Sequence, residues 1–157
     1  MNRGLHTEIR QRKPFASLEE EAYLNLLRTT DALARKEVEL LKTFGLSPSQ
    51  YNALRILRGA GDEGVTCTEL SERMLTKDPD VTRLIDRLES RHLIRRARSD
   101  QDRRVVRTTI TGAGLDLLSE LDGPCEAMVR SLLGHLDEKS LRSLIALLEE
   151  ARAGVAR

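Results

Sequence analysis

Leucine, isoleucine and valine recur at three- and four-residue intervals through most of this chain, a spacing typical of helices that bury one face. Glycine, proline and short polar segments interrupt the pattern. We predict helices over about residues 17–43, 48–58, 67–74, 79–91, 111–132 and 137–153. The first should stop at Gly45 and the second at Gly59, because glycine readily adopts the backbone that ends a helix. Pro124 should kink or break the fifth.

Polar residues at the predicted helix starts support these boundaries. Ser17, Ser47 and Thr66 each precede a Glu or Gln by three residues, the spacing of a capping box. In such a box the two side chains satisfy backbone N–H groups that the helix leaves free. Asp78, followed by Pro79, is the predicted cap of the fourth helix.

The segment between the fourth and fifth helices has no helical period. Residues 94–98 and 105–110 favour β-structure, the latter through its valines, threonines and isoleucine. The polar residues 99–102 (SDQD) between them are typical of a turn. We therefore predict a two-stranded hairpin.

A short helix, a tight turn, a second helix and a hairpin follow one another as in a winged helix-turn-helix. The second of these helices has an apolar face made by Val81, Leu84, Ile85 and Leu88. Its other faces carry Asp80, Thr82, Arg83, Asp86 and Arg87. The predicted fold class is mainly α with a small β-hairpin wing. We expect this helix to enter a DNA major groove, with the arginines as donors to guanine edges; the alternative is that Asp86 pairs with Arg83 or Arg87 on a hydrated surface.

The near-neutral net charge of +1 conceals a strong asymmetry. Residues 91–107 hold seven arginines and two aspartates, a local charge of +5, and no lysine. Residues 114–150 hold eight acids and three bases, a local charge of −5. Although a charged run is often only a solvated surface, a basic middle between acidic segments favours a polyanion partner. Arginine also suits phosphate forks and narrow minor grooves better than lysine does.

Composition argues against several classes of protein. With 39% apolar and 32% charged residues, the 157-residue chain is typical of a helix-rich globular domain. The longest apolar run, Leu144–Leu148, is far shorter than the ~20 residues that span a bilayer. We expect a cytoplasmic protein with no membrane partner. No catalytic motif is present, and the three histidines are scattered, so we expect neither an enzyme nor a cofactor.

The two cysteines do not form a metal site in this interpretation. Cys67 and Cys125 lie 58 positions apart, without a CxxC motif or a nearby histidine. We expect small apolar residues in a reducing compartment, and a redox-sensing role for Cys67 stays open.

The segment VTRLIDRLESRHLIRRARSDQDRRVVRTTIT, residues 81–111, resembles the MarR family (multiple antibiotic resistance regulators) of bacterial transcription factors. Family members carry a similar VTRLVDRLEERGLV helix and a wing with an Asp-x-Arg pattern, here Asp102-Arg103-Arg104. The resemblance extends over about residues 17–153. It implies a sequence-specific DNA-binding regulator, by default a repressor, that dimerises through residues 17–46 and 111–153 around a winged-helix lobe at 47–110. Two recognition helices about 34 Å apart would require a pseudo-palindromic site.

The resemblance also implies roles for individual residues. It implies groove contacts from Thr82, Arg83 and Arg87, backbone contact from Arg96, and minor-groove insertion by Arg104 with Arg103 nearby. Asp102 would hold the wing tip by pairing with an arginine. Asp80 departs from the family pattern and would either accept from a cytosine amine or repel wrong sites. His92 replaces a usual glycine at a position that often needs a left-handed backbone.

Three points stay open at the level of sequence. Residues 1–16, with a local charge of +3, are predicted to be a flexible basic arm before a single domain at 17–157. Family members often bind small phenolic or aromatic carboxylate effectors, but no pocket residues are assigned. A winged-helix module for protein–protein contact is the alternative function, which the arginine-rich wing disfavours.

Overall fold

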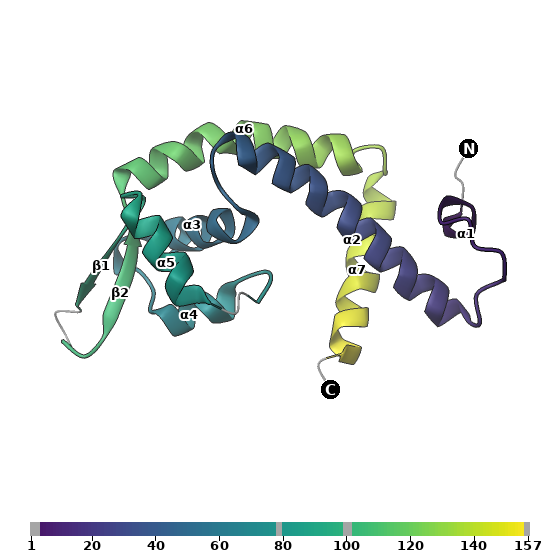
Figure 1. The fold of residues 1–157 in the computed structure, drawn as a ribbon, viewed down its shortest axis with the longest axis horizontal. Coiled ribbons are helices and arrows are strands. Elements are labelled where there is room, and N and C mark those ends of the chain that lie inside the picture. The colour runs from purple at the N-terminus through teal and green to yellow at the C-terminus, as the bar shows by residue number, and fades with distance from the viewer. Residues whose placement is uncertain (1–3, 78–79, 99–101, 156–157) are drawn as a thin grey trace. The chain divides into compact units, whose positions relative to one another are not determined.

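The computed structural model describes residues 4–77, 80–98 and 102–155. The chain forms two compact units, Met1–Ser119 and Glu120–Arg157, and the boundary between them falls inside helix α6 (Gly112–Leu133). Helices dominate, and one antiparallel hairpin accompanies them (Figure 1). The predicted fold class is confirmed.

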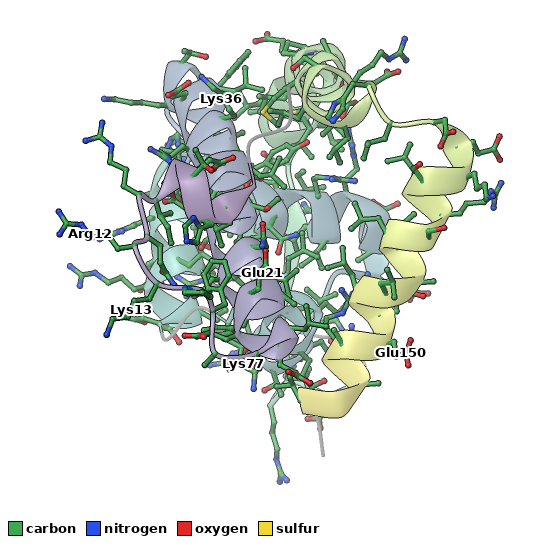
Figure 2. The ribbon with its side chains drawn as sticks, turned by 90° about the vertical axis from the view of Figure 1, so that its right-hand side faces the viewer. Arg12, Lys13, Glu21, Lys36, Lys77 and Glu150 are labelled. Carbon is green, nitrogen blue, oxygen red and sulfur yellow. The ribbon has the colours of Figure 1, made fainter. Side chains whose placement is uncertain are left out.

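The first unit begins with α1 (Leu5–Glu8) and the long α2 (Leu18–Thr43). The Ser17 side chain accepts a hydrogen bond from the backbone N–H of Glu20, as predicted for a helix start. Part of the arm that was predicted to be loose is instead folded. Leu5 is buried, and Glu8 lies 3.7 Å from Arg28 of α2, so a small apolar anchor and an ion pair hold α1 on α2. The segment between α1 and α2 has no regular secondary structure, and its exposed residues Arg12 and Lys13 extend away from α2 (Figure 2).

The winged-helix lobe continues with α3 (Pro48–Ala60), the 3-10 turn η1 (Gly61–Glu63), α4 (Cys67–Arg73) and α5 (Val81–Ser90). Complete capping boxes start α3 and α4, as predicted at Ser47 and Thr66. Helix α3 does not stop at Gly59 as predicted but at Gly61, whose φ is +61°. Glycine is tolerated within a helix at a cost of roughly 0.5–1 kcal/mol, and only the second glycine adopts the left-handed backbone that ends this helix.

The hairpin consists of β1 (Ile94–Arg98) and β2 (Val106–Ile110), paired in the register Ile94 to Ile110. Val65 adds a third short pairing at the base. Its N–H donates to the Thr108 carbonyl at 3.0 Å, and the Thr108 N–H donates back at 2.8 Å. Gly64 makes this approach possible because a Cβ there would lie 2.5 Å from the Thr108 carbonyl oxygen. The hairpin is thereby joined to the loop before α4.

The core of the lobe is aliphatic and lies where α3, α4, α5 and the base of the hairpin meet. All four predicted apolar residues of α5 are buried. Fully buried leucines come from each of the three helices: Leu54, Leu57, Leu70 and Leu88. This packing fixes one face of α5 inward and leaves the opposite face outward.

Helices α6 and α7 (Glu138–Val155) complete the chain. Thr111 caps α6, since its hydroxyl accepts from the Gly114 N–H at 3.2 Å, and Asp137 caps α7 through the Ser140 N–H at 2.8 Å. Pro124 was predicted to kink or break this helix; the break does not occur, since α6 is continuous from residue 112 to 133, and the kink stays a prediction. A proline removes a single N–H donor, and the regular bonds on both sides of it maintain this helix.

Candidate nucleic-acid interface

Helix α5 is held by its apolar face and by a cap on its first turn. The backbone N–H of Arg83 donates to the Asp80 carboxylate at 2.9 Å. The prediction of Asp78 as the cap falls outside the described residues; among the described residues α5 begins at Val81, and Asp80 caps it. One carboxylate oxygen of Asp80, which the sequence placed among the DNA-contacting residues, is therefore committed to starting the helix.

The outward face of α5 presents Thr82, Arg83 and Arg87, all exposed. Beside it lies an open polar concavity of about 260 Å³. It is lined by Ser47, Ser49, Gln50, Asp80, Arg83, Leu84 and Arg87. The first turn of α3 contributes to this concavity, and a helix N-terminus carries partial positive charge. Two guanidinium groups and a helix start on one surface make it attractive to an anion such as a phosphate.

The tip of the hairpin is organised by Asp102. Its carboxylate accepts from the backbone N–H of Arg104 at 2.9 Å, and its carbonyl accepts from the N–H of Val105 at 2.9 Å. Asp102 does shape the wing, but within the described part of the turn its carboxylate binds a backbone amide and not, as predicted, an arginine side chain. Arg103 and Arg104 are exposed here, and neither guanidinium has a partner among the described residues.

Several other arginines of this region make contacts within the fold. The Arg91 guanidinium donates to the Gly45 carbonyl at 2.7 Å and so ties the end of α5 to the loop before α3. Arg95 donates to the Thr109 hydroxyl across the hairpin at 3.1 Å. Arg107 donates to the Gly64 carbonyl at 3.1 Å. The +5 segment thus divides into arginines that make internal contacts and arginines that face outward.

Arg96 belongs to the first group, and its predicted contact with the DNA backbone stays a prediction. Its guanidinium Nε donates to Glu89 at 2.9 Å, and its Nη1 lies 2.8 Å from the Asp86 carboxylate. The hydrogen bond from Arg96 lowers the pKa of Glu89, and the same contact raises the pKa of Arg96 above its ordinary value. Asp86 therefore pairs with the hairpin and not with Arg83 or Arg87, the alternative considered above.

Comparison with known proteins agrees with this geometry. A model of the MarR family matches residues 44–105. The crystal structure of a MarR transcription factor from Planctomyces limnophilus is 44% identical, with 87% of this chain aligned to 98% of that one and a TM-score of 0.67. The chain belongs to the MarR family of transcription factors.

Two further relatives widen the comparison. The MarR-family chain is 32% identical to the HTH-type transcriptional repressor MdtR of Bacillus subtilis over 104 residues, 66% of each protein. The S. aureus MepR–DNA complex shares the fold at 22% identity and a TM-score of 0.75, with 85% of this chain aligned to 96% of MepR. The structure in hand thus has the architecture of a winged-helix transcription regulator.

His92, which departs from the family pattern, adopts the backbone conformation that this position requires. His92 has φ +58°, the left-handed conformation that glycine usually supplies at this position. Its carbonyl accepts from the Thr111 hydroxyl at 2.7 Å, which links the turn after α5 to the start of α6. His92 thus has a structural role in the MarR-family lobe.

Across the described residues, no group of histidine, cysteine or acidic side chains is arranged to hold a metal ion. The described helices also include none with the length and apolarity needed to cross a membrane. Cys67 is exposed, and its sulfur lies 4.0 Å from the Thr82 hydroxyl of α5.

Proposed function

We propose that this MarR-family chain is a cytoplasmic, sequence-specific regulator that binds double-stranded DNA. It would repress transcription by occupying a promoter. One observation carries the proposal: α5 has its aliphatic face buried and holds Arg83 and Arg87 outward, next to a hairpin that exposes Arg103 and Arg104. A helix with outward arginines fits a major groove, and an arginine-bearing hairpin reaches the neighbouring backbone or minor groove.

The roles of the contact residues follow from their chemistry. Arg83 and Arg87 would donate in pairs to guanine edges, with Thr82 beside them. Asp80, whose carboxylate also caps α5, would favour cytosine by accepting from its amine or would exclude wrong bases. Arg103 and Arg104 would enter a narrow minor groove, where negative potential is strongest.

We propose further that the regulator is a homodimer. In a single copy of the chain α7 has no buried residue, and Ile145 and Leu147 are more than half exposed at 54% and 64%. Helix α2 also exposes Leu18 and Tyr23. A second copy would cover such surfaces, and its two-fold symmetry would place two α5 helices on a pseudo-palindromic DNA site.

A small aromatic molecule is the proposed effector. The relative BpsR of Bordetella bronchiseptica, 22% identical with a TM-score of 0.74, has its DNA binding regulated by 6-hydroxynicotinic acid. A phenol or aromatic carboxylate would release DNA from this chain only if it binds the DNA-free conformation more tightly than the DNA-bound one. A panel of such compounds, titrated against the protein–DNA complex, identifies the class.

Selection of bound fragments from a random duplex library tests the function directly. We expect an enriched pseudo-palindrome whose half-sites are centred about 10 base pairs apart. The matched control is the Arg83→Ala, Arg87→Ala double variant, which keeps the fold because both side chains are exposed. Equal recovery of all sequences by the parent would reject sequence-specific recognition.

A further inference from the structure

Arg96 of β1 joins the hairpin to α5 through a cluster of polar contacts. Four donor groups of this residue point at two acids of α5. Its backbone N–H and its Nε donate to the two oxygens of Glu89 at 3.1 and 2.9 Å, and its Nη2 also contacts Glu89. Its Nη1 lies 2.8 Å from Asp86. Because Asp86 and Glu89 are three residues apart, they lie on one side of the helix and receive the guanidinium together.

The charge of this cluster argues against a phosphate contact. One arginine and two carboxylates sum to −1, and Arg96 is 35% exposed, with its donors already directed at acids. A DNA phosphate would have to displace those carboxylates and would meet their repulsion. By contrast, the guanidinium groups of Arg83 and Arg104 have no partner within the described ranges.

The position of Arg96 along the hairpin shows what the cluster does. Arg96 pairs with Thr108, the residue that also bridges to Val65. From there toward the tip, the strand backbones of the described residues pair only with each other. On the opposite strand, Arg107 is tied to the Gly64 carbonyl. Contacts from Arg96 on one strand and from Arg107 and Thr108 on the other therefore attach the hairpin to α5 and to the loop before α4.

We propose that Arg96 is a positioning residue: clamped by Glu89 and Asp86, it fixes the direction of the hairpin relative to α5, so that the helix and the hairpin tip engage one duplex together. The proposal rests on the proposed DNA-binding function. Isolated exposed ion pairs contribute little to stability. A guanidinium that is shared by two carboxylates, however, restricts the orientation of the hairpin relative to α5 as well as adding electrostatic attraction.

A salt series distinguishes this role from a phosphate contact. Dissociation constants for the selected duplex would be measured by fluorescence anisotropy at several salt concentrations, for the parent, Arg96→Ala, Glu89→Ala and the double variant. We expect each single variant to bind the duplex about five- to twentyfold more weakly than the parent. The double variant should bind no more weakly than either single variant, because both substitutions remove the same Arg96–Glu89 contact. The dependence of log K on log salt should keep its slope.

A phosphate contact predicts the opposite pattern. Arg96→Ala would lower the slope by about 0.9, and Glu89→Ala would strengthen binding by removing a negative charge near DNA. Either result overturns the proposal. Arg96→Lys separates the two cases again, since lysine keeps the charge but cannot fork between two acids: we expect it to lose affinity as Arg96→Ala does. Arg95→Ala is the matched control, because Arg95 bonds Thr109 within the hairpin, so its effect should add to that of Glu89→Ala.

A second measurement needs no DNA. Hydrogen exchange of the amides at 94–98 and 106–110 should speed up in Arg96→Ala and in Glu89→Ala but not in Arg95→Ala, if the clamp restrains the hairpin. Unchanged exchange in both clamp variants rejects the positioning role. Should the parent bind no duplex at all, the proposed function fails, and the exchange result alone then decides the role of Arg96.

Discussion

The winged-helix lobe buries most of its leucine side chains, whereas α7 buries none of its leucines. In the lobe, Leu57 and Leu88 are completely buried by neighbouring elements of the same chain. In α7 no residue is buried, and Leu147 is 64% exposed although it repeats at helical spacing with Leu144. Both patterns look alike in the sequence. A periodic apolar face therefore predicts that a surface will be covered, but not whether the same chain covers it.

The difference separates two kinds of stability. The lobe completes its own core, so its folding should depend little on protein concentration. The exposed face of α7 would be completed by a second copy, so its contribution should rise with concentration. The changes that follow test this division, beginning with the largest expected effect.

The first change adds charge to the apolar face of α7. In the double variant Leu144→Asp, Leu147→Asp, two buried leucines would be lost from each subunit of a dimer, at about 1.5–3 kcal/mol each. We expect dimers to dissociate at concentrations where the parent is fully dimeric, as measured by sedimentation equilibrium. Arg142→Glu is the control: it changes the helix charge by the same amount and affects only an exposed pair with Glu138. Dimers of unaltered strength in the double variant would exclude this face from the interface.

The second change removes a leucine from the core of the lobe. Leu88→Ala should lower the free energy of unfolding by about 2–5 kcal/mol, because the rigid packing around α5 cannot close the cavity. Urea unfolding at two protein concentrations checks it, and the loss should be equal at both. Leu147→Ala provides the comparison, with a smaller loss that grows with concentration. The same concentration dependence for both leucines would remove the distinction between the two regions.

A third change stays on the surface of the lobe. Arg83→Ala should cost about 1–3 kcal/mol in binding the selected duplex and relax the preference at one base pair, while dimerisation stays intact. Binding to a panel of single-base variants of the site measures this. If base selectivity survives in full, Arg83 does not read the groove.

A fourth change addresses the hairpin tip. Arg104→Ala should weaken binding on every duplex alike and reduce the salt slope by roughly 1, as expected for the loss of one phosphate-region contact. Affinities for specific and random duplexes over a salt series measure both effects. A slope equal to that of the parent would contradict the role of Arg104.

The sequence predicted those features that depend on neighbours within one turn. The helix starts at Ser17, Ser47 and Thr66 were correct because a capping signal lies within four residues. The full capping box forms at Ser47 and Thr66, whereas at Ser17 only the serine half of it forms, since the Glu20 carboxylate accepts from the Ala16 N–H instead. The hairpin was located for a similar reason, since β-favouring residues flank a polar turn. The outward face of α5 followed from helical periodicity alone.

The features that depend on tertiary contacts were not predicted. Asp80 was not predicted as the cap of α5, because two aspartates precede this helix and are chemically equal in the sequence; in the structure the helix starts at Val81, which is buried in the lobe core. The pairing of Arg96 with Glu89 spans seven residues and a reversal of the chain, so no local pattern encodes it. The sequence signal for this pairing was the presence of two acids, Asp86 and Glu89, about one helical turn apart on α5.

The smallest expected effect concerns pH and the clamp itself. The hydrogen bond from Arg96 lowers the pKa of Glu89, so the folded chain binds that proton less tightly than the unfolded chain does. Glu89 then stabilises the fold at pH above its ordinary value, about 4.3, and this contribution is lost as pH falls through the lowered value. Compared with Glu89→Gln, the parent should be more stable near neutral pH by at most about 1 kcal/mol, the usual limit for half-exposed pairs. Urea unfolding of both proteins between pH 7 and pH 3, with Asp86 unchanged, should show this difference shrinking only below about pH 4.3. A difference that stays constant with pH would mean that the charge of Glu89 does not hold Arg96.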